Sequence, residues 1–350
     1  MAEPRIHILH ENDDWLPPLR AALESAGVPY EEWRLDGGSI DLASIPPEGV
    51  FWSRLSASSH TRDHEHAKEY ARAVYRWLES HGRRVVNGSR VVELEVSKVA
   101  QYAALAAAGF DVPRTIAVFG SADLVARARE LPVPFITKHN QGGKGLGVRR
   151  FDSYEEFDAY VASDDFEQPV DGITLLQEYV QTAAPFVTRA EFVGGELVYA
   201  VRVDTSAGTF ELCPAEACAV PAQEGTAPSG AVALAGLIDG PVAPVLVQGF
   251  ATAACDVPGA GESSLFTVRD DVGAADPFIV RLGAFLAAQG VEVAGVEYFE
   301  TADGRLVPYD INTNTNYSPD VEAATGAVGA GAVADYLGRA LAADYAAVTA

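Results

Sequence analysis

Hydrophobic and polar positions alternate in short runs through the first quarter of the chain. The runs that predict strands are at 5–10, 28–35, 49–55 and 84–88. Helical patterns occupy 16–26 and the segment from Arg62 to Ser80. Strands that alternate with helices build a parallel sheet. Residues 1–92 are therefore expected to form a small open α/β lobe.

The middle of the chain mixes short strands with helices. The segment 92–115 predicts one helix, ended by Gly109, and Pro113 opens the next strand. Further strands are expected at 114–120, 134–140, 147–151 and 173–180, with helices at 121–130 and 153–163. Residues 93–182 are expected to form a central lobe.

The last part of the pattern predicts an antiparallel sheet with helices, over residues 183–350. A hairpin at 185–205 turns at two glycines, and a second at 293–314 turns at Asp303-Gly304. Between them, residues 203–268 contain no Lys or Arg. We interpret 205–268 as an insertion, a cap or a specificity loop. The alanine-rich end predicts a packed terminal helix.

Composition and charge narrow the class of partner. With 350 residues, of which 48% are hydrophobic, the chain suits two or three packed lobes. The formal charge of -24 repels phosphate backbones and anionic lipid, so neither nucleic acid nor a membrane surface is an expected partner. A small anionic ligand in a local basic pocket remains compatible with this charge.

Cysteine use and the absence of targeting patterns favour a cytoplasmic protein. Cys213, Cys218 and Cys255 are too few for a disulfide framework and fit a reducing compartment. They also cannot form a four-ligand metal site, because no histidine lies from residue 140 onward. The first residues show no signal-peptide pattern, and no uncharged apolar stretch is long enough to span a bilayer.

The hairpin at 293–314 carries a set of oxygen ligands. With its turn at 303–304, Glu297 falls roughly opposite Asp310, and Asn312 shares the face of Asp310. Two carboxylates and an amide oxygen suit Mg²⁺, which often bridges nucleotide phosphates. The alternative is a strand face that is polar for no functional reason.

A glycine-rich turn, "FITKHNQGGKGLGV", is the second candidate. Glycines let backbone N–H groups approach phosphate oxygens. The turn is not a P-loop, because no Ser or Thr follows Lys144, and not a Rossmann turn, because a strand follows it. A flexible hairpin tip is the alternative. Lys138 favours the functional interpretation, because it is a charge on an otherwise apolar strand.

Two weaker elements complete the candidate site. "LLQEYV" ends a strand with Gln177, Glu178, Tyr179 and Val180, which could offer backbone groups to a purine ring. Lys98, in a predicted helix, could reach phosphates from another side.

In this order the parts resemble the ATP-grasp superfamily, most closely its RimK-like carboxylate–amine ligase branch. The parts are a helical lysine before a proline-led strand, a lysine-bearing strand with a glycine loop, a Gln-Glu-Tyr hinge, an arginine-bearing hairpin and an acidic hairpin with asparagine. The resemblance covers about residues 90–330 apart from the insertion. It implies the ATP-grasp fold and ATP with Mg²⁺ (or Mn²⁺) as cofactors.

The resemblance also implies residue roles. Lys98 and Lys138 would contact ATP phosphates, and Glu297, Asp310 and Asn312 would bind the metal. Arg202 would face the transferred phosphoryl group, and Arg189 a substrate carboxylate. The remaining nucleotide contacts would be a mobile loop of Gly142, Gly143, Lys144, Gly145 and Gly147, and an adenine pocket of Gln177, Glu178, Tyr179 and Val180.

The chain departs from the family pattern in two places. Val187 stands where relatives carry an acid, so the ribose contact passes to Glu191 as a candidate. The Arg-Ser-Asn segment that usually follows the second hairpin strand is replaced by the insertion. The residues that would bind the acceptor are therefore unassigned.

The implied activity is ATP-dependent joining of a small carboxylate to an amine through an acyl phosphate, in a chain that could self-associate. A kinase of the same fold and a nucleotide-binding module without turnover are the alternatives.

A strand end of the first lobe carries further candidates. They could border the cleft or form a solvated loop, and they are Arg54, Ser56, Ser58 and Arg62. A metal site at His60, His64 and His66 is less favoured, because no Cys lies nearby.

Overall fold

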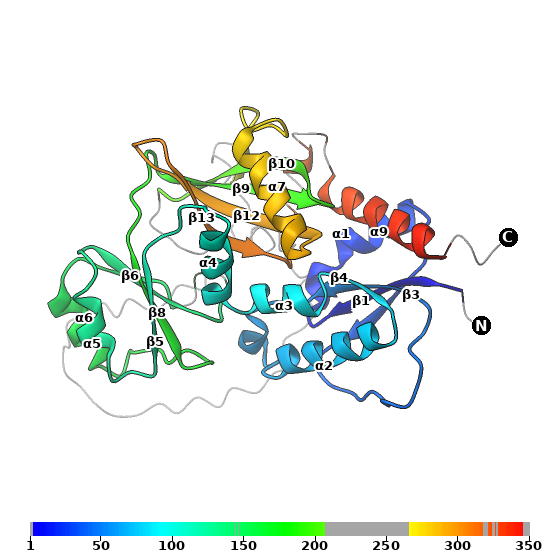
Figure 1. Cartoon of the computed structure of the whole chain (residues 1–350), viewed down its shortest axis with the longest axis horizontal. Helices are drawn as coiled ribbons and strands as arrows, with labels where there is room; N and C mark the ends of the chain where they lie inside the picture. The colour runs from blue at the N-terminus through cyan, green and yellow to red at the C-terminus, as the bar shows by residue number, and fades with distance from the viewer. Residues whose placement is uncertain are drawn as a thin grey trace, which may run out of the picture.

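The computed structural model describes residues 3–143, 145, 147–206, 266–317, 321–323, 326 and 328–345. Within these residues the strands form three sheets, and helices α3 (Ser89–Glu95) and α4 (Lys98–Ala107) lie between them (Figure 1). The mixed α/β fold class expected from the sequence is confirmed. No helix in the described part of the chain combines the length and apolarity needed to cross a bilayer.

The N-terminal sheet is parallel, in the order β2-β1-β3-β4. Its strands are β1 (Arg5–His10), β2 (Tyr30–Arg34), β3 (Gly49–Arg54) and β4 (Arg84–Val86). On one face Ile8 and Trp52 pack with α1 (Pro17–Ser25) and α9 (Gly329–Tyr345). On the other face Phe51 packs with α2 (Ala67–Ser80). Short 3-10 helices, η1 (Asp13–Trp15) and η2 (Ser59–Arg62), follow β1 and β3 at the carboxyl edge.

Two helices differ from the expected boundaries. The helix expected from Arg62 begins instead at Ala67, after the separate turn η2. The single helix expected over 92–115 is divided into α3 and α4, because Ser97 is extended and its Oγ accepts a hydrogen bond from the amide of Ala100. A serine N-cap starts a new helix, which places Lys98 in the first turn of α4.

The central sheet is antiparallel, in the order β5-β8-β6-β7. Its strands are β5 (Thr115–Phe119), β6 (Phe135–His139), β7 (Arg149–Phe151) and β8 (Ile173–Glu178). Phe135 and Phe151 pack with Phe157 of α6 (Tyr154–Val161) and with α5 (Leu124–Ala128) on one face. The side chains that alternate with them point to the other face.

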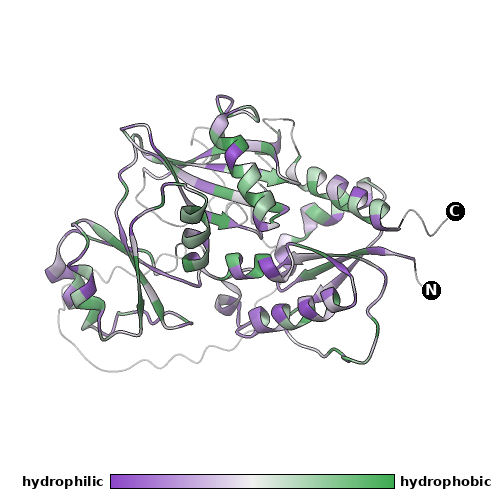
Figure 2. Ribbon diagram, in the orientation of Figure 1, coloured by the Kyte–Doolittle hydropathy of each residue, from purple (hydrophilic) through white to green (hydrophobic). Residues whose placement is uncertain are grey.

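The C-terminal sheet is antiparallel, in the order β11-β10-β9-β12-β13. Its strands are β9 (Phe186–Val193), β10 (Glu196–Asp204), β11 (Phe266–Val268), β12 (Val293–Glu300) and β13 (Leu306–Asn312). Helix α7 (Pro277–Gln289) covers one face, where Leu282 packs on Phe192 and Ala200. Figure 2 shows that α7 and α4 are largely hydrophobic, and both contribute side chains to the core on this face of the C-terminal sheet.

The limits of the insertion differ from the sequence expectation. Residues 266–268, expected within it, form β11 and pair with Val201 to Val203 of β10. Residues 207–265 lie outside the described residues, as do Cys213, Cys218 and Cys255. The terminal helix is confirmed as α9, and it packs against α1 of the N-terminal lobe.

Candidate functional site

The N-terminal lobe and both antiparallel sheets contribute to one cleft, with a volume of about 250 Å³. The N-terminal lobe contributes Trp15, Ser56 and Ser58 to its lining, and the central sheet contributes Ile136, Lys138 and Gln177. The C-terminal sheet contributes Arg189, Glu297, Asp310 and Asn312. Residues that are far apart in the sequence therefore meet at one place.

The acidic side of the cleft is built by the pairing of β12 with β13. Glu297 lies directly opposite Asp310, and Asn312 is two residues further along the same face. Tyr309 donates a 2.6 Å hydrogen bond to Oε2 of Glu297. A register shift just after Glu297 accounts for the unusual position of Tyr309, which lines the cleft beside its neighbour Asp310.

The two carboxyl groups have opposite pKa shifts. Burial raises the pKa of Glu297, an effect that Arg189 opposes and Asp310 reinforces. Burial acts in the same direction on Asp310, but the charges of Lys98 and Lys138 outweigh it and hold the pKa of Asp310 below its ordinary value. Asp310 is thus the more firmly ionised partner.

Two lysines face these acids. Lys98, in the first turn of α4, forms an ion pair with Asp310. Lys138, on β6, is only 8% exposed and donates a 3.0 Å hydrogen bond to Tyr102 Oη. Lys138 makes no ion pair with any described residue. A buried ammonium that no carboxylate of the described residues contacts directly fits an anionic ligand in the cleft.

Arg189 lies beneath Glu297 and is fully engaged. It donates to Glu191 Oε1 at 2.6 Å, to Glu297 Oε1 at 2.8 Å and to Thr315 Oγ1 at 2.6 Å. Glu191 is 1% exposed and is not part of the cleft lining. The structure therefore places Glu191 as the buried counterion of Arg189 and does not bring it to the position expected for a ribose contact.

Arg202 is the predicted site residue that the structure places furthest from its expected role. Its neighbour Val201 pairs with Arg189, so Arg202 points to the opposite face of the C-terminal sheet. There its guanidinium lies 4.5 Å from the ring centroid of Phe186. The structure does not bring Arg202 together with the other predicted residues.

The predicted hinge borders the cleft at the end of β8. Glu178, Tyr179 and Val180 line it, with Gln177 beside them. Gln177 donates to Thr115 Oγ1 at 2.8 Å, and Glu178 Oε1 accepts from the amide of Arg114 at 2.9 Å. These bonds attach the strand end to β5 and fix the wall that the hinge forms.

The glycine-rich turn lies over the same cleft. Gly142, Gly143 and Gly145 line it, and Gly143 lies close to Ser58 of the N-terminal lobe. Gly147 does not line it, but a Cβ there would come within 2.2 Å of the His139 ring. With φ of +67°, that position requires glycine for two reasons. Lys144 lies outside the described residues.

Some cleft residues were missed from the sequence. Tyr309 and Glu95 line the cleft, and Tyr102, outside the lining, accepts a hydrogen bond from Lys138. Glu95 accepts hydrogen bonds from Ala57 N at 3.1 Å and from Thr313 N and Oγ1 at 2.8 Å. A lone Glu in a helix and a Tyr beside an acid carry no sequence signal of this placement.

The other predicted contacts of the N-terminal lobe divide into two groups. Ser56 and Ser58 line the cleft. Arg54 does not, because it bonds to Thr315 O and Asn316 Oδ1 behind the lining. The metal site considered at His60, His64 and His66 does not assemble among the described residues, because His64 Nδ1 lies 3.0 Å from Glu11.

The oxygen donors fit a divalent cation. Glu297, Asp310 and Asn312 share one face of a hairpin, and the Asn312 side chain makes no hydrogen bond with any described residue. Hard carboxylate and amide oxygens are the ligands that Mg²⁺ selects. Lys98 and Arg189 neutralise the two acids in the present arrangement.

Solved structures with the same arrangement identify the fold. A RimK domain ATP-grasp protein from Sphaerobacter thermophilus is 15% identical, with a TM-score of 0.59 and coverage of 95% of this chain and 98% of its own. The D-cycloserine synthetase DcsG is 18% identical, with a TM-score of 0.60 and coverage of 96% and 99%. The chain has the ATP-grasp fold. The ATP-grasp ligase PsnB, solved with its minimal precursor, Mg and ADP, is 14% identical, with a TM-score of 0.58 and coverage of 96% and 98%.

The sequence alone gives no such match. No family model matches it, and neither does any curated protein. The ATP-grasp similarity is therefore a similarity of fold, and the chemistry must be argued from the cleft.

Proposed function

We propose that this ATP-grasp protein is an ATP-dependent ligase that joins a carboxylate to an amine. The observation that carries the proposal is the position of Lys138. It is a buried cation without an ion-pair partner among the described residues, and it lies in one cleft with Glu297, Asp310 and Asn312. A nucleotide whose phosphates lie between them would satisfy both sides.

The lining allows separate roles. Gln177 to Val180 would bind the adenine, and the glycine-rich turn with Lys98 and Lys138 would bind the phosphates. Glu297, Asp310 and Asn312 would hold Mg²⁺ or Mn²⁺, which supplies charge neutralisation on the phosphate oxygens. Arg189 would keep Glu297 oriented through its 2.8 Å bond. No such role follows for Arg202, which points away from the cleft.

The reaction would proceed in two displacements. A carboxylate oxygen bonds to the γ-phosphorus while the bond from that phosphorus to the bridging oxygen breaks, and ADP leaves with the electron pair. An amine nitrogen then bonds to the acyl carbon, the carbon–oxygen bond to phosphate breaks, and a proton is released. The protein acts by alignment and charge stabilisation. Water must be kept from the acyl phosphate until the amine reacts with it. The glycine-rich turn over the cleft would exclude that water.

Similar structures support one class of substrate. The comparison structures include a ligase bound to a precursor peptide and a D-cycloserine synthetase. An amino acid or small peptide is the class that we propose for the carboxylate.

Trapping with hydroxylamine tests the proposal. The full chain is incubated with ATP, Mg²⁺, hydroxylamine and each of a panel of amino acids and acetate, and both ADP and hydroxamate are measured. We expect a hydroxamate with at least one carboxylate. Lys138→Met should lower its rate by orders of magnitude, whereas Lys68→Met should not, because Lys68 is also buried (2% exposed) but does not line the cleft.

The outcomes separate the alternatives. ADP with a phosphate ester and no hydroxamate would establish a kinase. Binding of MgADP without turnover on any carboxylate would leave a nucleotide-binding protein. Either result would reject the ligase.

A further inference from the structure

Two serines at the carboxyl end of β3 line the cleft and contact each other. Ser56 Oγ and Ser58 Oγ are 2.9 Å apart, and the amide of Ser58 donates to Ser56 Oγ at 3.2 Å. Both residues are nearly buried, at 8% and 2% exposed. Ser58 also meets the glycine-rich turn, since a Cβ on Gly143 would lie 3.5 Å from its Oγ. Ligands of open parallel sheets bind at this edge.

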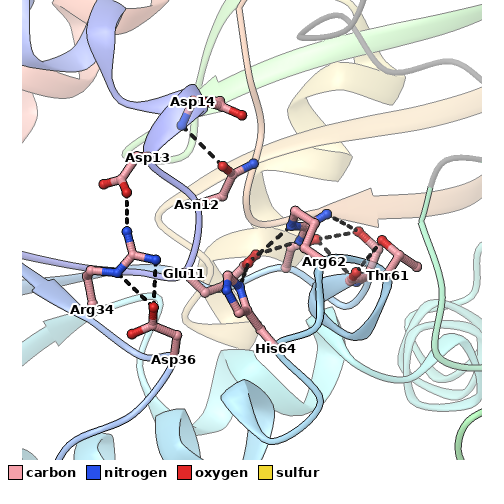
Figure 3. A network of polar contacts seen from close by, with 11 residues as sticks. Glu11, Asn12, Asp13, Asp14, Arg34, Asp36, Thr61, Arg62 and His64 are labelled. Atoms are coloured by element: carbon pink, nitrogen blue, oxygen red, sulfur yellow. Dashed lines mark hydrogen bonds and ion pairs between the residues drawn. The ribbon is translucent and has the colours of Figure 1, made fainter. Parts of the chain in front are cut away.

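A clamped arginine fixes the direction of these hydrogen bonds. Arg62 donates to Glu11 through Nε at 3.1 Å and Nη2 at 2.6 Å, and Glu11 is 0% exposed (Figure 3). Its guanidinium also lies 4.6 Å from the Trp15 ring centroid. The remaining nitrogen, Nη1, is directed to Ser58 Oγ at 3.3 Å.

One of the two hydroxyl protons therefore has no hydrogen-bond acceptor among the described residues. A guanidinium has donors only, so Ser58 Oγ must accept from Arg62. Ser56 Oγ must accept from the Ser58 amide. One hydroxyl proton lies between the two oxygens, and the other finds no acceptor among the described residues, whichever serine holds it. Glu95 also lines the cleft, but its hydrogen bonds with the described residues are to Ala57 and Thr313, and neither serine hydroxyl bonds to it.

We propose that the Ser56–Ser58 pair is a donor subsite for the carboxylate of the substrate, and that Arg62 is the positioning residue that orients it. The inference rests on the proposed function, which requires a carboxylate beside the nucleotide phosphates. The hydroxyl proton that has no acceptor among the described residues can be donated to a carboxylate oxygen, which only accepts. Glu11 holds Arg62 in place, and Trp15 supplies an apolar surface beside it.

Kinetic variants test the subsite. Ser56→Ala with Ser58→Ala should raise KM for the carboxylate about 10- to 100-fold, since a hydrogen bond to a charged group is lost. Affinity for MgADP, measured by calorimetry, should not change. Ser59→Ala is the matched control, because Ser59 is buried in the same segment, its Oγ has no hydrogen-bond partner among the described residues and it does not line the cleft. Equal loss of MgADP affinity would assign the pair to the nucleotide, and equal effects of the control would reject the subsite.

The positioning role has its own readout. Arg62→Gln should raise KM for the carboxylate with little change in kcat, and Arg62→Lys should recover part of the loss because it keeps a donor. A purely structural role would lower kcat and thermal stability in both variants without separating KM from kcat.

A structural measurement decides the subsite even if no carboxylate is turned over. Crystals of the MgADP complex are soaked in sodium acetate, with sodium chloride as the reference. An acetate oxygen within hydrogen-bond distance of Ser56 or Ser58 Oγ, absent from the double alanine variant, supports the subsite. Acetate that is missing there, or equally present in the variant, overturns it. Failure to form any hydroxamate would instead count against the proposed function.

Discussion

Two asparagines show how one residue type takes two roles around the cleft. Asn87 is 1% exposed and makes four hydrogen bonds, two from Nδ2 to Val293 O and Thr313 O and two to Oδ1 from the amides of Glu292 and Val293. Asn312 makes none with the described residues, although it lines the cleft. Asn87 therefore holds the lobes together, whereas the amide of Asn312 is available to a ligand.

Replacing each by alanine should separate stability from ligand binding. Asn312→Ala should lower Mg²⁺-dependent ADP affinity at least about tenfold and change the free energy of unfolding by less than about 1 kcal/mol, because no hydrogen bond with the described residues is lost. Asn87→Ala should cost about 3 kcal/mol, because buried backbone groups lose their partners. Chemical denaturation and calorimetry measure the two quantities. Comparable stability losses in both variants would contradict the assignment.

At the scale of single residues, strand alternation predicts which side chains share a face of a sheet. The prediction is correct where the register is known. Glu297 and Asp310 could be placed opposite each other from the turn at 303–304, and the structure pairs them. Arg202 could not be placed correctly, because the register shift between Leu197 and Tyr199 sets which residues of β10 face the cleft. Glu191 shares the face of Arg189, but only the side-chain geometry shows that Glu191 forms an ion pair with the arginine and does not line the cleft.

At the scale of elements, local signals fixed the type of each segment better than its ends. A continuous helical pattern over 92–115 concealed the break at Ser97, since serine is compatible with a helix interior and becomes a cap only through its backbone conformation. The strand β11 was hidden for a different reason. It has three residues and is stabilised by pairing with β10, which is distant in sequence.

Strand β1 carries an element-scale feature with a pH consequence. His7 and His10 are each 1% exposed at the centre of the N-terminal sheet. Burial lowers the pKa of both below the ordinary value of 6.5, and it outweighs the opposing effects of Glu48 and Glu31 on His7 and of Asp13 and Glu32 on His10. The folded protein thus resists protonation that the unfolded chain accepts.

Stability should therefore decrease as the pH falls below about 6.5, by up to about 1.4 kcal/mol per pH unit for each histidine, because the unfolded state then binds more protons. His10→Leu should reduce this slope between about pH 6.5 and 5, since leucine binds no proton at this buried position. Urea unfolding at a series of pH values measures it. The exposed His66 provides the control, and His66→Leu should keep the wild-type slope. Identical slopes in wild type and His10→Leu would contradict the argument.

At the scale of the whole molecule, the cleft depends on contacts between lobes that are separate in sequence. Helix α9, from the end of the chain, packs on α1 and on the N-terminal sheet. Arg54, at the end of β3, reaches the segment after β13, where it donates to Thr315 O at 2.5 Å and Asn316 Oδ1 at 2.6 Å. That segment carries Asn314 and Asn316 into the cleft lining. The polar face that begins with Asp310 is thus held from behind by another lobe.

Removing this contact should loosen the cleft wall as well as destabilise the fold. Arg54→Met should lower the free energy of unfolding by about 2–4 kcal/mol, because Arg54 is 2% exposed and its charge-assisted bonds have no substitute. Hydrogen exchange should rise at Thr313, whose amide is otherwise held by Glu95 at 2.8 Å. The stability of Arg54→Lys should lie between that of the wild type and that of Arg54→Met. The lysine ammonium reaches one of the two acceptors at most, whereas the guanidinium reaches both. Arg76→Met is the control, since its 3.8 Å pair with Glu79 is on an exposed surface of α2 and contributes little. If Arg54→Met lowers global stability but leaves exchange at Thr313 as slow as in the wild type, the segment is held by the C-terminal lobe alone, and the proposed dependence of the cleft on the N-terminal lobe is wrong.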